Sequence, residues 1–274
     1  MTEIVFFDID GTLTTKGNNI PESTIKAIAK LKANNIEPVI ATGRPPILMA
    51  DIAEKLNIDS YISMNGQYIV YKGDPVELNP LSISSVDRLV DFANEREDGL
   101  ILCTEDELII NSRILLNPKS WYLKILKKLS FLVPKSLEMK IREKAMKEKI
   151  KKTDYENKEI YMVNLNVDRI GEESYRKNFD EFHFTRANEH AMDVINQGVS
   201  KARGIEKLLK YLKVEQKDTV AFGDGLNDLE MIEYVGKGIA MKNGFEELKA
   251  KADFVTDSVF DDGIMKALKK INLI

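Results

Sequence analysis

The chain opens with an apolar run that leads directly into two aspartates. The stretch "IVFFDID" places four apolar residues in a row without polar alternation, which is typical of a strand buried on both faces of a parallel sheet. A second such run, "EPVIATG", lies between two segments of helical periodicity at 20–36 and 45–58. Alternating strands and helices predict an α/β fold whose parallel sheet is flanked by helices.

The pattern changes after residue 81. Short strands at 60–66 and 68–73, joined through Asn65-Gly66, end the first segment of alternating strands and helices. A helix is then expected at 82–95, a hairpin at 100–113, and half-solvated strands at 159–168 and 180–187. Strand and helix alternate again from 200 onward. We therefore expect a core formed by 1–81 and 190–274, interrupted by an α+β domain at 82–189.

Composition excludes several classes of protein. A net charge of −4 gives no overall field that would attract nucleic acid or an anionic membrane. The single cysteine, Cys103, cannot form an intramolecular disulfide, which favours a reducing, cytoplasmic compartment. With His183 and His190 as the two histidines, a zinc site is not expected. No signal peptide is expected, and no apolar run approaches the ~20 residues of a membrane span. The oligomeric state stays open.

Asp8 and Asp10 follow the first buried strand at a spacing of two. If the strand geometry continues, both side chains point to the same side, where two carboxylates repel each other unless a cation intervenes. Ligands bind at this end of the strands in open α/β sheets, and Mg²⁺ prefers oxygen ligands. The alternative is a simple turn at the end of the strand, because Asp-Gly favours turns.

Two further segments fit an anion. Thr42 and Gly43 end the second buried strand before a helix, where a hydroxyl and backbone N–H groups can hold a phosphate. Arg44 would add charge there, or would form an exposed ion pair. Lys201 falls in the first turn of a helix capped by Ser200, a position disfavoured for a cation unless an anion is bound. The alternatives are an ordinary strand–turn–helix connection and a solvated surface lysine.

A third group of polar residues follows the buried strand "VAFG". Asp224 stands between two glycines that permit close approach, and Asn227 and Asp228 open the next helix. Asp228 could serve only as an N-cap. All these groups lie at strand C-termini or helix N-termini of one sheet, so they should meet in one crevice. Carboxylates, Mg²⁺ and anion donors together describe phosphoryl transfer.

The motifs "DIDGTLT", "ATGR", "GVSKA" and "GDGLND" resemble, in this order, the four signature motifs of the haloacid dehalogenase superfamily. The inserted domain resembles the C2B cap of the Cof-type phosphatases of subfamily IIB, so a Rossmannoid core is expected. Departures from the family pattern are small and remove no reacting group. They are Asn196, Ala202, Lys242 and Gly244.

The resemblance implies a role for each matching residue. Asp8 would be the nucleophile that forms an aspartyl-phosphate, and Asp10 the general acid and base. Mg²⁺ would be held by Asp8, the backbone carbonyl of Asp10 and Asp224, with Asp228 supporting the metal from behind. The phosphate would be bound by Thr42, Gly43, Lys201, Asn227 and the backbone at Ile9.

The expected function is therefore a Mg²⁺-dependent phosphatase acting on a small phosphorylated metabolite, with a sugar phosphate as the default and FMN or pyridoxal phosphate as alternatives. A phosphomutase of the phosphomannomutase type and a non-enzymatic binding protein on the same scaffold remain as rivals. No nucleic acid or membrane partner is expected. A basic run at 119–152 would attract anionic substrates or an anionic membrane surface, or simply form solvated helix faces.

Overall fold

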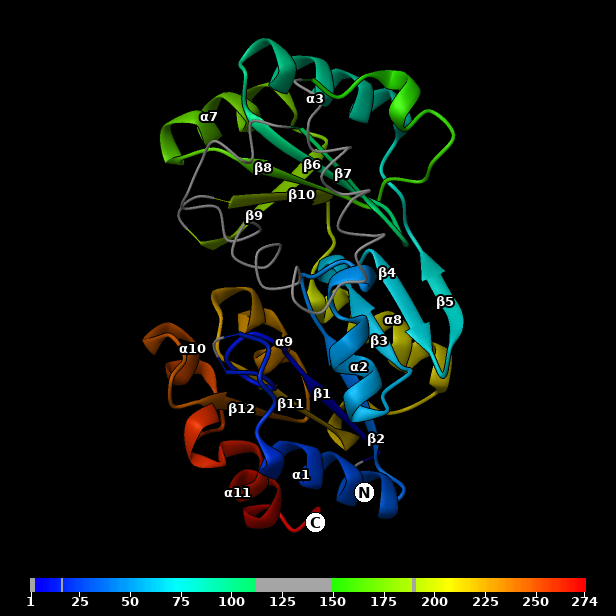
Figure 1. The fold of residues 1–274 in the computed structure, drawn as a ribbon. Coiled ribbons are helices and arrows are strands. Elements are labelled where there is room, and N and C mark those ends of the chain that lie inside the picture. Colours follow the sequence, from blue (N-terminus) through cyan, green and yellow to red (C-terminus); the bar gives the residue numbers. More distant parts are fainter. Residues whose placement is uncertain (1–2, 16, 112–148, 189–190) are drawn as a thin grey trace. The chain divides into compact units, whose positions relative to one another are not determined.

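The computed structural model describes residues 3–15, 17–111, 149–188 and 191–274. The chain divides into two compact units. Unit 1 comprises Met1–Leu78 and Val199–Ile274, and unit 2 comprises Asn79–Gly198 (Figure 1). The sequence placed the second boundary earlier, at 189/190. The structural boundary lies later because a strand at Ala191–Asn196 pairs within the sheet of unit 2.

Unit 1 is built on an eight-stranded sheet with the order β13-β12-β11-β1-β2-β3-β4-β5. The strands from β13 to β3 pair in parallel, and β4 and β5 are added antiparallel. This arrangement confirms the predicted α/β core. The strands are β1 (Ile4–Phe7), β2 (Glu37–Ala41), β3 (Tyr61–Ser63), β4 (Tyr68–Tyr71), β5 (Asp74–Leu78), β11 (Thr219–Gly223), β12 (Lys237–Met241) and β13 (Phe254–Thr256).

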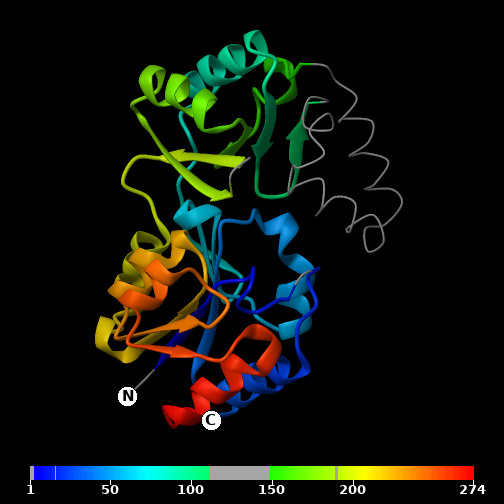
Figure 2. The ribbon, with the colours of Figure 1, turned by 90° about the vertical axis from the view of Figure 1, so that its left-hand side faces the viewer.

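Helices cover both faces of this sheet (Figure 2). In β1, Val5 and Phe7 pack into one apolar cluster with α1 and α11, whereas Ile4 and Phe6 pack into a second cluster with α8 and α9. The predicted burial of β1 on both faces is therefore confirmed. The helices are α1 (Glu22–Ala33), α2 (Ala50–Leu56), α8 (Lys201–Leu212), α9 (Leu229–Tyr234), α10 (Glu246–Lys251) and α11 (Gly263–Lys270).

Unit 2 holds a five-stranded antiparallel sheet with the order β7-β6-β8-β10-β9, and α3 and α7 pack against one of its faces (Figure 1). The α+β character and the β6–β7 hairpin agree with the prediction, whereas α7 and β10 were not anticipated. The elements are α3 (Ile83–Glu95), β6 (Gly99–Cys103), β7 (Leu108–Ile110), β8 (Met162–Asn166), α7 (Arg169–Asn178), β9 (Phe182–Asn188) and β10 (Ala191–Asn196).

Three other expectations need comment. The single helix expected at 45–58 is divided into a 3₁₀ turn, Pro46–Leu48, and α2, because Met49 between them has a φ of −121°. Most of the basic run at 119–152 lies outside the described residues. Among the residues that the structure does describe, no helix is both long and apolar enough to cross a membrane.

Candidate active site

Lys201 is the central cation of the site. It is the first residue of α8, and Ser200 caps the helix by accepting a hydrogen bond from the backbone N–H of Arg203. Lys201 is only 1% exposed, and its Nζ donates to Asp8 Oδ1 and to Asp228 Oδ1, each at 2.6 Å. This position rules out the alternative of a solvated surface lysine. The two carboxylates keep the ammonium charged, since they raise its pKa although burial alone would lower it.

Asp228 connects Lys201 to the loop after β11. Its Oδ2 accepts hydrogen bonds from the backbone N–H groups of Asp224 (3.0 Å) and Gly225 (2.9 Å), while Oδ1 accepts from Lys201. The carboxylate therefore supports the loop behind it and makes no side-chain cap for α9. Gly223 is required here, because a Cβ at this position would lie 2.6 Å from the Cβ of Asp228.

Carboxylate oxygens of Asp8, Asp224 and Asp228 lie within 4.8 Å of one another and could hold a metal ion. Burial raises the pKa of Asp8 well above its ordinary value, and Lys201 opposes the shift only in part. Burial and the neighbouring Asp228 raise the pKa of Asp224 to about 7. A divalent cation among these oxygens would favour the ionised forms, and an all-oxygen donor set suits Mg²⁺. Three N–H donors already occupy Asp228, so Asp8 and Asp224 are the better placed ligands.

Two residues that sequence reasoning missed orient Asp224. Thr12, which is fully buried, directs its hydroxyl to Asp224 Oδ1 at 3.5 Å. Asn243 donates from Nδ2 to Asp224 Oδ2 at 3.3 Å and to the Gly11 carbonyl at 2.8 Å. Thr12 lies within the motif "DIDGTLT", and Asn243 lies between Lys242 and Gly244, so both are in segments that the family resemblance covers. These contacts tie Asp224 to the loop that follows β1.

The Thr42–Gly43 segment continues β2 at the same end of the sheet as Asp8. Thr42 is 1% exposed, its N–H donates to the Ile62 carbonyl, and its hydroxyl oxygen accepts from the backbone N–H of Arg44 at 3.1 Å. Ile9 is fully buried between the two aspartates. Asn227 is half-buried in the 3₁₀ turn Leu226–Asp228. The structure thus places the proposed phosphate donors on the loops that follow β1, β2 and β11.

A strained turn after β3 supports this arrangement. Met64 and Asn65 have φ values of 49° and 56°, and Gly66 has a φ of 105°. Asn65 donates its N–H to the Thr42 carbonyl at 3.0 Å, and a Cβ at Gly66 would lie 2.5 Å from the Ser200 carbonyl oxygen. The turn therefore packs against both the Thr42 loop and the start of α8.

Arg44 is buried, and part of its guanidinium is already bound to Asp10, so the whole group is not available to another anion. It is 2% exposed and donates to both carboxylate oxygens of Asp10, from Nε at 2.8 Å and from one terminal nitrogen at 2.5 Å. The Asp10 side chain itself is 59% exposed. The ion pair expected as one alternative therefore exists, but its cation is buried.

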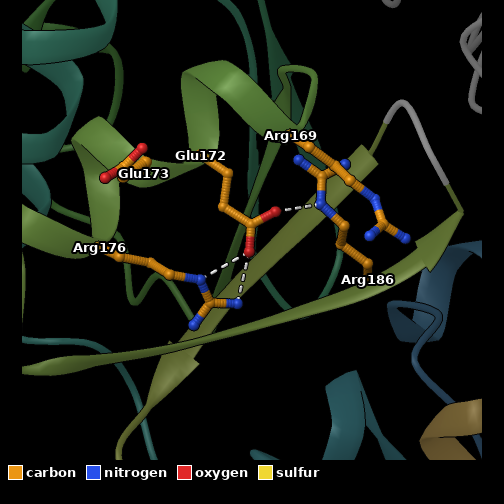
Figure 3. A pocket seen from close by; sticks show the side chains of 5 residues that line it. All are labelled: Arg169, Glu172, Glu173, Arg176 and Arg186. Atoms are coloured by element: carbon orange, nitrogen blue, oxygen red, sulfur yellow. Dashed lines mark hydrogen bonds and ion pairs between the residues drawn. The ribbon is translucent and has the colours of Figure 1, made fainter.

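A separate pocket of about 440 Å³ lies in unit 2 (Figure 3). Glu172 at its centre pairs with Arg176 of the same helix and with Arg186 of β9. Burial would raise the pKa of Glu172, but the two guanidinium groups lower it below its ordinary value. One carboxylate thus serves both arginines and fastens α7 to β9. The residues that line the pocket are Arg169, Glu172, Glu173, Arg176 and Arg186.

Comparison with known proteins gives a consistent result. The profile of the haloacid dehalogenase-like hydrolases matches residues 5–268. YkrA of Bacillus subtilis (strain 168) is 38% identical over 276 residues, which cover 100% of this chain and 99% of YkrA. The 5-amino-6-(5-phospho-D-ribitylamino)uracil phosphatase YcsE of the same organism is 26% identical, covering 97% of this chain and 94% of YcsE. The solved structure of the subclass IIB sugar phosphatase BT4131 has a TM-score of 0.78 at 26% identity and covers 100% of both chains.

Proposed function

This chain belongs to the haloacid dehalogenase-like hydrolases and is a phosphatase of subclass IIB, and we propose that it uses Mg²⁺ and an aspartyl-phosphate on Asp8 to hydrolyse a small phosphorylated metabolite. The observation that carries the proposal is the burial of Lys201 between Asp8 and Asp228, beside Asp224. Such a group of charges is costly to bury unless a phosphate and a metal complete it.

Each residue of the cluster has a distinct task in this proposal. Asp8, the backbone carbonyl of Asp10 and Asp224 hold Mg²⁺, which supplies charge neutralisation for the phosphoryl oxygens. Lys201 neutralises further phosphoryl charge and orients Asp8 through its 2.6 Å contact. Asp228 holds Lys201 in place. The remaining phosphate contacts come from Thr42, Gly43, Asn227 and the backbone at Ile9.

The reaction has two halves. In the first half, Asp8 attacks phosphorus, and the bond to the leaving oxygen breaks as Asp10 gives that oxygen a proton. In the second half, a water attacks the phosphorus of the aspartyl-phosphate, and Asp10 takes the proton of this water. Asp8 leaves as a carboxylate together with inorganic phosphate.

A sugar phosphate or a related phosphorylated polyol is the proposed substrate class. The names of YcsE and BT4131 each specify a compound of this kind as the substrate of that protein. The single cysteine and a metabolite substrate favour action in the cytoplasm. Relatives named as phosphatases favour water as the acceptor over the sugar phosphate that a phosphomutase requires.

The proposal is tested with p-nitrophenyl phosphate and a panel of sugar phosphates, with Mg²⁺ and with EDTA. Hydrolysis should require Mg²⁺, and acid quenching followed by peptide mass analysis should find the phosphoryl group on Asp8. Asp8→Asn should abolish both signals, whereas Asp74→Asn, the same change at an exposed position of β5, should abolish neither. A phosphoryl group on another residue, or full activity in EDTA, would contradict the proposal.

A further inference from the structure

Arg44 is almost fully buried, and its guanidinium is bound on several sides. Nε and one terminal nitrogen donate to the two carboxylate oxygens of Asp10, at 2.8 and 2.5 Å. That terminal nitrogen also donates to Asn18 Oδ1 at 2.9 Å, and the other terminal nitrogen donates to the Leu48 carbonyl at 3.1 Å. These contacts fix the guanidinium plane, so the plane and direction of the Asp10 carboxylate are fixed with it.

The bidentate contact also uses both oxygens of Asp10 as hydrogen-bond acceptors. A guanidinium offers only donors, so the O–H of a carboxylic acid would find no acceptor in it. Both oxygens of Asp10 are acceptors in the observed geometry, as in a carboxylate. Of the two halves of the reaction, the first needs Asp10 with a proton and the second needs it without one. The contact with Arg44 therefore presents Asp10 as the proton acceptor that the second half needs.

We propose that Arg44 is a positioning residue that holds the Asp10 carboxylate ready to accept the proton of the attacking water. The inference rests on the proposed role of Asp10. In this step the water oxygen forms a bond to phosphorus and the bond between phosphorus and the Asp8 oxygen breaks. The proton of the water passes to Asp10, and inorganic phosphate and the Asp8 carboxylate are released.

Steady-state kinetics with p-nitrophenyl phosphate and Mg²⁺ test the inference in Arg44→Gln. The p-nitrophenolate leaves with little help from an acid, so kcat/KM, which covers the steps up to its departure, should stay within about threefold of wild type. The kcat includes hydrolysis of the aspartyl-phosphate and should fall by about tenfold or more, as for loss of a general base. KM should therefore fall with kcat, and a pre-steady-state burst of p-nitrophenolate should appear.

This split separates the inference from a structural role. A fraction of misfolded protein lowers kcat and kcat/KM by the same factor, and so leaves KM unchanged. Loss of a direct contact between Arg44 and the substrate phosphate would lower kcat/KM. Equal losses in the two parameters, a loss confined to kcat/KM, or wild-type kinetics would each overturn the inference.

Arg203→Gln is the matched control, because it makes the same change at an exposed arginine of α8 whose guanidinium pairs with Glu206. It should leave both parameters near wild type; the kcat defect of Arg44→Gln in this variant would show that the effect is not specific to the contact with Asp10. Asp10→Asn should show the same fall in kcat, and adding Arg44→Gln to it should lower kcat little further. If Asp10→Asn keeps the wild-type kcat, the proposed role of Asp10 fails; if the two defects multiply, only the inference about Arg44 fails.

Discussion

Protein freed of metal with EDTA should lose thermal stability as the pH rises from about 5 to about 8, and Asp224→Asn should remove part of this loss. The ordinary pKa of the aspartate is 3.8, and that of Asp224 in the folded chain is about 7. Between these values the folded state binds more protons than the unfolded state. The contribution of Asp224 to stability is therefore complete below pH 3.8 and decreases as the pH rises toward 7.

The size of this effect follows from the shift. About two pH units separate pH 5 from the Asp224 pKa of about 7, and they correspond to about 3 kcal/mol at ~1.36 kcal/mol per unit. Asp224 is only half-buried, so solvent screening should reduce the effect on the free energy of unfolding to about 2 kcal/mol. For a chain of this size, we expect a fall in Tm of about 4–8 °C across the window. Asp8 is shifted in the same direction and should add to the loss.

Differential scanning fluorimetry measures the effect without using activity. The wild type and Asp224→Asn are compared across the pH window, with EDTA and with excess Mg²⁺. Mg²⁺ should raise the wild-type Tm more at about pH 8 than at about pH 5, because the cation competes with protons for the carboxylates. Asp74→Asn, which removes an exposed carboxylate of β5, should behave as wild type. An Asp224→Asn variant as sensitive to pH as the wild type, or a Mg²⁺ shift of equal size at both pH values, would refute the reasoning.

Three further predictions concern the same cluster. Lys201→Ala should lower kcat/KM for p-nitrophenyl phosphate at least tenfold, since a charge contact of this kind contributes on the order of 2–4 kcal/mol in the transition state; a wild-type kcat/KM would remove Lys201 from the phosphate site. Gly11→Ala should raise the Mg²⁺ concentration for half-maximal activity by about 10-fold or more, because a Cβ there would lie 2.1 Å from Asp224 Oδ2. Gly73 has a similar positive φ, but a Cβ there would meet no atom within 4 Å, so Gly73→Ala is the control. If both variants need the same raised Mg²⁺ concentration, backbone strain alone explains the effect. Ca²⁺ in place of Mg²⁺ should support little hydrolysis because of its longer, looser coordination, and equal rates with the two ions would argue against a tight octahedral site.

The parts of the fold that were predictable from the sequence are those whose periodicity is strong. β1 is apolar at every position and is buried on both faces, and the N-cap at Ser200 has the expected hydrogen bond. Helix α7 was missed because Tyr175 is its one buried residue, which leaves no apolar stripe to detect. The hydrophobic pattern thus reports how much of an element is buried, and it says little about elements that are held by ion pairs.

The candidate site shows a related limit. Carboxylates at strand ends could be assigned to one crevice, because the topology of a parallel sheet brings strand C-termini together. Partners within the crevice depend on side-chain reach and on which charges are buried. Arg44 could be expected to meet an anion, but only the structure shows that the anion is Asp10 and that the cation, not the carboxylate, is the buried member. A buried arginine with an exposed aspartate is costly as a purely structural pair, since the cation loses its hydration while water screens its partner. The arrangement is better explained if the exposed carboxylate must remain accessible to water while its orientation is fixed from behind.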